Sequence, residues 1–168
     1  PLLTGRFATI ARQTDQAPVV LDRLETQGQL GTVPVDFMLA QLRLQTAQQF
    51  NTDVEKALAD RAAPALFIRG GTMTLDQLAT EATKSYPDAL QRDGETLLAR
   101  WPIVIWSDAA LVVGSGQTLE LSTTDGAFLL NSGLLTLDRG TLSASQGTNP
   151  GIKNFRPFVA TAMTGAMQ

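Results

Sequence analysis

Short apolar runs separated by turn residues dominate residues 101–145. Gly, Asp, Asn and Ser interrupt these runs at intervals too short for helices, so strands joined by tight turns are predicted. A shift of about 23 residues superimposes apolar positions of this segment on one another, and a period of this size is typical of stacked coils that bury their apolar side chains against one another. The aligned pairs are Ile105 on Phe128, Trp106 on Leu129, Leu111 on Leu134, Val112 on Leu135, Thr118 on Thr141 and Leu119 on Leu142.

Two copies of a period leave the pairing of the strands open. The segment is compatible with the first coils of a parallel β-helix, and also with an antiparallel meander or sandwich in an α+β protein. After a loop of composition QGTNPG, the segment Ile152–Gln168, which contains Phe155–Ala160, is expected to start another strand. A last coil left open would present unpaired backbone groups, so the chain is expected either to continue beyond Gln168 or to be completed by a partner.

Residues 35–63 follow a helical period instead. Apolar residues recur there at spacings of three and four, among Ala, Gln, Glu and Lys: Phe37, Met38, Leu42, Leu44, Phe50, Val54 and Leu58. A break at Asn51-Thr52-Asp53 divides the pattern into two helices, and Pro64 ends it. Residues 1–33 are interpreted as an extended lead-in, with Ala17–Leu21 as its one candidate strand.

Local signals are stronger between residues 64 and 100. Ala65–Ile68 predicts a short strand that ends at Gly70-Gly71. Thr74 and Gln77 have the spacing of a capping box, which predicts a helix with Leu75, Leu78, Ala79 and Ala82 on its apolar face. Asp93-Gly94 is a strong turn dipeptide. The chain therefore divides into a mixed, partly helical N-terminal capping region (1–100) and a β-ribbon (101–168).

Composition restricts the possible chemistry. The 168 residues are 43% hydrophobic and 17% charged with a net charge of −3, which fits a folded domain and gives no electrostatic case for nucleic acid. No apolar run approaches the roughly 20 residues that span a bilayer. The chain has no Cys and no His, which removes thiol catalysis, the usual general base and the commonest zinc ligand. No metal or cofactor is expected.

Three cations are the candidate ligand-binding groups. Arg139 follows an apolar strand, and Lys153 and Arg156 come shortly afterwards. Arg and Lys suit sugar carboxylates by charge, so the three side chains together predict a carboxylate-binding stripe. The alternative is an exposed ion pair between Asp138 and Arg139 at a turn, plus two loop charges.

Two tryptophans and one asparagine have both a structural and a functional interpretation. Trp106 is a candidate platform for a sugar ring, although a Trp within an Ile/Val run is more often core. Its spacing from Trp101 puts the two side chains on opposite faces of a straight strand. Asn131, between an apolar run and Ser132-Gly133, is expected to satisfy backbone groups at a turn.

The order of these elements resembles a known family. Gly71, Thr74, Leu75 and Leu78, followed by PIVIW, ALVVGSGQTLEL and GAFLLNSGLLTL, are similar to the region that leads into bacterial right-handed parallel β-helix proteins. Within that group the resemblance, over residues 64–162, is to mannuronan C5-epimerase-like and related exopolysaccharide-acting proteins. It implies a mainly β protein with a helical N-terminal part, located in the periplasm or outside the cell, that lays an acidic polysaccharide along its coils.

The resemblance carries over no catalytic residue. The family's epimerases and lyases abstract the C5 proton with an Asp-Pro-His-Asp type motif, helped by Arg or Lys, whereas this chain has no His and only the reversed Pro87-Asp88. Any uronate epimerase or lyase site is therefore expected beyond Gln168. The competing hypothesis is a surface or assembly module without enzymatic activity, adhesin-like or scaffold-like, which pairs with a partner or with itself through an open β edge.

Overall fold

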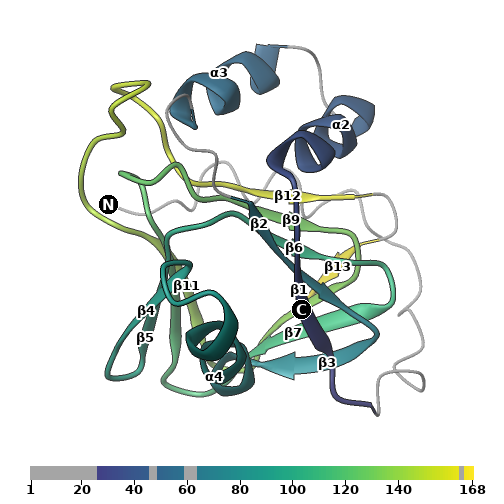
Figure 1. Ribbon diagram of the computed structural model, residues 1–168. Coiled ribbons are helices and arrows are strands. Elements are labelled where there is room, and N and C mark those ends of the chain that lie inside the picture. Colours follow the sequence, from purple (N-terminus) through teal and green to yellow (C-terminus); the bar gives the residue numbers. More distant parts are fainter. Residues whose placement is uncertain (1–25, 46–48, 59–63, 163–164) are drawn as a thin grey trace.

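The computed structural model describes residues 26–45, 49–58, 64–162 and 165–168 of the chain. The described part is mostly β, with helices α2 (Val35–Gln45), α3 (Gln49–Ala57) and α4 (Leu75–Ser85) (Figure 1). The candidate strand Ala17–Leu21 lies outside the described residues. Among these residues, no helix is long and apolar enough to cross a lipid bilayer.

The strands form three sheets. The first contains β1 (Gln29–Val33), β2 (Ala65–Arg69), β6 (Ile103–Ile105), β9 (Leu129–Asn131) and β12 (Val159–Thr161), in that order. The second contains β13 (Ala166–Met167), β10 (Leu134–Leu137), β7 (Ala109–Val113) and β3 (Gly71–Thr74). The third contains β11 (Thr141–Ala144), β8 (Thr118–Leu121), β5 (Thr96–Ala99) and β4 (Leu90–Asp93).

The chain passes through the first, second and third sheets in the same order again and again, and we call one such pass a circuit. Each strand of a circuit pairs in parallel with the equivalent strand of the next circuit. Antiparallel pairing occurs only where β1 joins β2 and β4 joins β5, among the strands that the structure describes. The strands of residues 101–145 are therefore not arranged as the antiparallel meander that the sequence also allowed.

The observed register corrects the single period that the sequence suggested. Thr118 pairs with Thr141 and Leu119 with Leu142, as predicted, but Leu111 pairs with Leu135 and Ile103 with Leu129. The sequence separation between paired residues thus has the predicted value for β8 and β11. It is one residue longer for β7 and β10, and three residues longer for β6 and β9. It changes because the turns that join β9 to β10 and β10 to β11 are shorter than the equivalent turns one circuit earlier.

Tight packing at the corners explains the short turns. A Cβ atom on Gly133, between β9 and β10, would lie 2.2 Å from the carbonyl oxygens of both Trp106 and Ala109. Only glycine allows successive circuits to approach this closely. Asn131, at the end of β9, is fully buried and its side-chain amide donates a hydrogen bond of 2.7 Å to the Ala166 carbonyl of the next circuit. This residue has the structural role that the sequence predicted.

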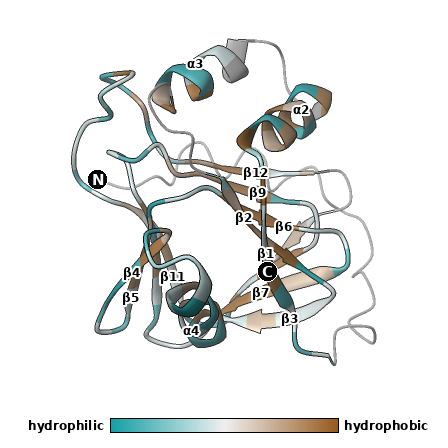
Figure 2. Cartoon of the chain, in the orientation of Figure 1, coloured by the Kyte–Doolittle hydropathy of each residue, from teal (hydrophilic) through white to brown (hydrophobic). Residues whose placement is uncertain are grey.

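The main hydrophobic core lies between the three sheets. It is built from rows of side chains that are in register across circuits, such as Met73, Leu111 and Leu135 in the second sheet. Alternate residues of each strand face this interior, because successive side chains of a strand point to opposite faces. The brown segments of Figure 2 follow these strands.

A second core lies on the outer face of the first sheet, beneath α2 and α3. Phe128, Leu130 and Val104 face outward there and pack with Met38 and Leu42 of α2, while Val54 of α3 completes the cluster. In Figure 1 both helices lie over this sheet. They therefore cover the side of the stack of circuits.

The break between α2 and α3 is not where the sequence placed it. Asn51-Thr52-Asp53 lies within α3, and the two described helices are separated by residues 46–48. These polar residues have only a weak preference against helix. Burial of Val54, Ala57 and Leu58 on one helical face outweighs that preference.

Helix α4 follows its prediction closely. The Gln77 amide donates to Thr74 Oγ1 (3.2 Å) and the Thr74 amide donates to Gln77 Oε1 (2.8 Å), which completes the capping box. Leu75, Leu78, Ala79 and Ala82 are buried, as expected. The helix packs against β3 and β4, so its apolar face becomes part of the main core.

Two strands differ from the expectation. β1 was interpreted as part of a lead-in, yet it pairs with β2 because Leu30 packs onto the main core and Val33 onto the second core. The strand expected within residues 152–168 is β12, which begins only at Val159. Phe155 is buried without strand pairing, and its ring packs edge-on against that of Phe158 at 6.5 Å.

Candidate functional site

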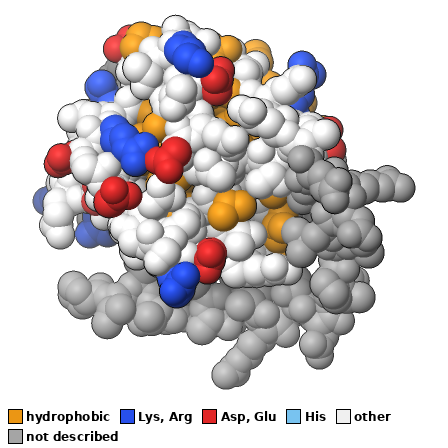
Figure 3. Space-filling view, turned by 90° about the horizontal axis from the view of Figure 1, so that it is seen from below, with side chains coloured by type: hydrophobic (Ala, Val, Ile, Leu, Met, Phe, Trp, Pro, Cys, Tyr) orange, Lys and Arg blue, Asp and Glu red, His pale blue; other side chains and the backbone are white. Residues whose placement is uncertain are grey.

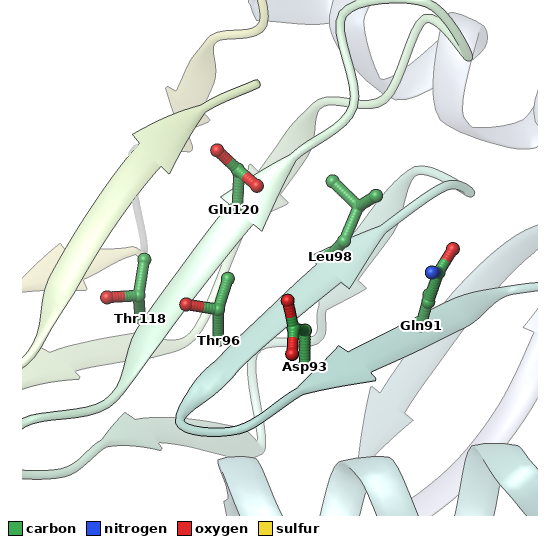
Figure 4. A pocket seen from close by; sticks show the side chains of 6 residues that line it. All are labelled: Gln91, Asp93, Thr96, Leu98, Thr118 and Glu120. Carbon is green, nitrogen blue, oxygen red and sulfur yellow. The ribbon is translucent and has the colours of Figure 1, made fainter. Parts of the chain in front are cut away.

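A shallow hollow of about 330 Å³ lies on the outer face of the third sheet (Figure 4). Its six lining side chains come from β4, β5 and β8, and form two rows across these strands. One row is Gln91, Leu98 and Glu120, and the other is Asp93, Thr96 and Thr118. We call these six side chains the outer-face grid.

The local sequence explains why these side chains share one face. The predicted turn at Asp93-Gly94 is present, with Gly94 at a φ of 57°, and it folds β4 back onto β5. In β5 and β8 the buried positions are Leu97, Ala99, Leu119 and Leu121. The residues between them must point outward, because the side-chain period of a strand is two.

The grid offers hydrogen-bonding groups that the protein itself leaves unused. No hydrogen bond or ion pair joins any of its side chains to another residue in the described part of the chain. Two carboxylates accept, one amide and two hydroxyls both donate and accept, and Leu98 supplies an apolar surface between them. Asp93 and Glu120 stand at opposite corners with Thr96 and Leu98 between, so they do not form a close carboxylate pair.

Arg139 lies at the corner between the second and third sheets. It has a φ of 54°, unusual for a residue with a side chain, and its guanidinium lies 3.7 Å from the Asp138 carboxylate. Both side chains are exposed, by 81% and 66% respectively. The pair has the geometry of the exposed turn ion pair that was the alternative interpretation, which contributes little to stability.

Lys153 and Arg156 lie at a different corner, in the long connection from β11 to β12. Both are exposed. This connection is fixed to α3 and to the turn after β8 by Asn149, whose side-chain amide donates to the Ala57 carbonyl at 2.8 Å. Along the chain, Arg139 therefore lies before β11 and the other two cations lie after it.

Trp106 lies directly after β6 and is half-buried in the second core. Its ring centroid is 5.9 Å from that of Phe37 in α2 and 5.4 Å from that of Phe67 in β2. Trp101 packs against the main core and lies 6.2 Å from Tyr86. The two tryptophans thus lie on opposite sides of the first sheet, as their spacing predicted, and one face of Trp106 serves packing.

The outer-face grid was missed in the sequence. Its acidic residues are isolated along the chain, and no motif joins residues 91–98 to residues 118–120. The one available signal is the polar alternation of TLEL, which places Thr118 and Glu120 on an outer face; TLLA gives this signal only at Thr96. Whether these side chains lie close together depends on the strand register, and hydrophobic periodicity alone does not predict that register.

A buried polar cluster lies at the corner after β8. The Ser122 hydroxyl donates to Asp125 Oδ2, and the Arg100 guanidinium lies 3.5 Å from the same oxygen. Ser122 also caps the turn, because its Oγ accepts a hydrogen bond of 3.1 Å from the Asp125 backbone amide. These contacts stabilise the corner. Within the described ranges, no group of three or more Asp, Glu, His or Cys is arranged to hold a metal ion.

The surface charge is mixed. On the face seen from below, acidic and basic side chains are interspersed, and hydrophobic side chains are exposed at several places among them (Figure 3). The described part of this face therefore presents no large patch of charge of one sign.

Comparison with solved structures defines the class of fold. The chain matches the crystal structure of the periplasmic alginate epimerase AlgG with a TM-score of 0.57 and 19% sequence identity, over 96% of this chain and 37% of that protein. Two mutant structures of the same epimerase match with TM-scores of 0.56 and 0.58 at 20% and 19% identity, with the same coverage. No protein-family model and no curated protein sequence matches the chain.

The match therefore shows a shared fold with one part of an alginate epimerase. At 37%, the chain spans well under half the length of that enzyme. This agrees with the resemblance to the epimerase-like group that the sequence indicated. An identity this low does not transfer activity, because function resides in particular side chains placed on a fold.

Proposed function

We propose that this chain is part of an exported right-handed parallel β-helix protein that binds or modifies an acidic polysaccharide. The observation that carries the proposal is the parallel, in-register stacking of the circuits, in the fold shared with a periplasmic alginate epimerase. Each added circuit extends the same outer faces along the stack. A linear polymer can follow such a surface over several sugar units.

In this proposal, residues 1–100 serve as the capping region. Two features support this role: β1 and β4 end the first and third sheets with antiparallel strands, and α4 packs into the core beside β3 and β4. Any epimerase or lyase chemistry would require a group that abstracts the C5 proton. With neither His nor Cys in the chain, we assign that step to residues outside these 168.

Binding to polysaccharides tests the proposal. We expect polymannuronate to bind more weakly as the salt concentration rises, because its carboxylates meet Arg139 on one side of β11 and Lys153 and Arg156 on the other. The variant Lys153→Ala/Arg156→Ala should weaken binding about tenfold, since charge-assisted hydrogen bonds are lost. Arg139→Ala, measured separately, shows whether the corner between the second and third sheets contributes to polymannuronate binding.

Lys84→Ala is the matched control, because it removes an exposed cation from α4, away from both corners. Isothermal titration calorimetry at low and physiological salt measures all variants. A chain that binds neither polymannuronate, polyguluronate nor a neutral glycan contradicts the proposal.

A second candidate function is a non-enzymatic assembly module. The observation that favours it is that β11, β12 and β13 each end a sheet, so one edge of each lacks a strand partner in the described residues. Met167 of β13 is also 43% exposed. Concentration-dependent self-association in sedimentation experiments, without polysaccharide binding, would favour this function.

A further inference from the structure

Positive and negative side chains occupy different places around the third sheet. The cations Arg139, Lys153 and Arg156 lie at the corners before and after β11, whereas the hollow on the sheet face contains only the carboxylates of Asp93 and Glu120. Arg92 is the nearest cation in sequence to the hollow. It is engaged elsewhere, because its guanidinium lies 2.6 Å from Asp76 and donates to the Gly94 carbonyl at 3.0 Å.

A sugar carboxylate in the hollow would meet like charge. It would face Asp93 and Glu120 with no described cation lining the site, and like charges at close range repel even at a partly exposed surface. A sugar unit without charge would not be repelled and could form hydrogen bonds instead. Its hydroxyls can donate to the two carboxylates, and the hydroxyls of Thr96 and Thr118 can both donate and accept.

The centre of the hollow fits the rest of a sugar ring. Leu98 lies between Gln91 and Glu120 in register, and its half-buried side chain presents an apolar surface among the polar groups (Figure 4). Carbohydrate sites combine such an apolar contact with a few polar groups that fix orientation. The volume of about 330 Å³ is at the lower end of the range for small-ligand sites.

We propose that the outer-face grid is a subsite for an uncharged sugar unit, one whose C6 carries a hydroxymethyl or esterified carboxyl group, and that it rejects a free uronate. This inference rests on the proposed polysaccharide function and specifies it further. The corner cations receive charged units of the polymer, and the grid receives a neutral one.

The test compares two oligosaccharides of equal length that differ at C6. Oligomannose carries a hydroxymethyl group where oligomannuronate carries a carboxylate. Calorimetric titration of the 168-residue chain at low salt should show that Asp93→Asn/Glu120→Gln raises the affinity for oligomannuronate about tenfold, because two repelling charges are removed. The same variant should lower the affinity for oligomannose about threefold, because charge-assisted hydrogen bonds become neutral ones.

Thr118→Val removes one hydroxyl at nearly constant shape and should weaken oligomannose binding several-fold. Glu95→Gln is the matched control for charge, because Glu95 is exposed in the adjacent turn and does not line the hollow. It should change neither affinity. Opposite shifts of the two affinities in Asp93→Asn/Glu120→Gln are the expected signature of the subsite.

Two results overturn the inference. If oligomannuronate binds through Lys153 and Arg156 but neither the grid charges nor Thr118 affects either ligand, the subsite is wrong and the proposed function stands. If an oligomer of a cationic amino sugar binds more tightly than oligomannose and loses that preference in Asp93→Asn/Glu120→Gln, the hollow is a cation site. Failure of every oligosaccharide and polymer to bind contradicts the proposed function itself.

Discussion

At the scale of single residues, one buried side chain holds the longest irregular connection in place. Asn149 is 3% exposed, and its amide nitrogen lies within hydrogen-bonding distance of the Ala57, Thr123 and Thr124 carbonyls. Its Oδ1 accepts from the Gly151 and Ile152 amides at 2.8 and 3.1 Å. One side chain thus satisfies backbone groups of α3, of a turn and of its own loop.

We therefore expect Asn149→Ala to lower the free energy of unfolding by about 1–3 kcal/mol, because buried backbone groups lose their partners. Urea denaturation followed by circular dichroism measures the change. Asn154→Ala is the control, since Asn154 is exposed in the same connection and should change stability by less than about 0.5 kcal/mol. Equal losses in the two variants would show that the Asn149 contacts contribute nothing specific.

At the scale of elements, α4 shows how far local sequence can predict structure. Its start, its capping box and its buried face all follow from residues three or four apart, and all are observed. The same holds for the β4–β5 hairpin, where Asp93-Gly94 supplies a turn with positive φ. The division between α2 and α3 was predicted wrongly, because packing on the first sheet outweighed the weak propensities of Asn51, Thr52 and Asp53.

The capping box makes a prediction at this scale. Thr74→Ala should lower the free energy of unfolding by about 0.5–2 kcal/mol, because the Gln77 amide loses its acceptor at the helix start. Thr80→Ala, at an exposed position of the same helix, should be neutral or slightly stabilising, since Ala is the better helix former. Thermal and urea denaturation of both variants test this, and a Thr74→Ala protein as stable as Thr80→Ala would argue against the cap.

At the scale of the whole molecule, stability depends on rows of side chains stacked between circuits. Leu111 is fully buried in the main core between Met73 and Leu135, whereas Val112 is half-buried and faces the other side of the second sheet. The two residues are adjacent in β7 but face opposite sides of the sheet. Substitutions at these two positions therefore compare how much the interior face and the outer face of the second sheet contribute to the free energy of unfolding.

Leu111→Ala should lower the free energy of unfolding by about 2–5 kcal/mol, because it leaves a cavity in the stacked row. Val112→Ala should cost less than about 1.5 kcal/mol, because less apolar surface is uncovered on a partly exposed face. Calorimetric unfolding of both variants provides the comparison. A larger loss in Val112→Ala would mean that the outer face of the second sheet carries more of the packing than the interior.

The sequence by itself determined the local features: the strands and turns of residues 101–145, the hairpin, α4 and the offset between β8 and β11. These depend on residue type, on alternation, and on hydrogen bonds between residues a few positions apart. Only the tertiary structure decided the parallel pairing, the longer offsets in the first and second sheets, the burial of one face of Trp106 beneath α2 and the outer-face grid. Each of these joins residues that are distant in the chain, and small differences in turn length set which of them meet.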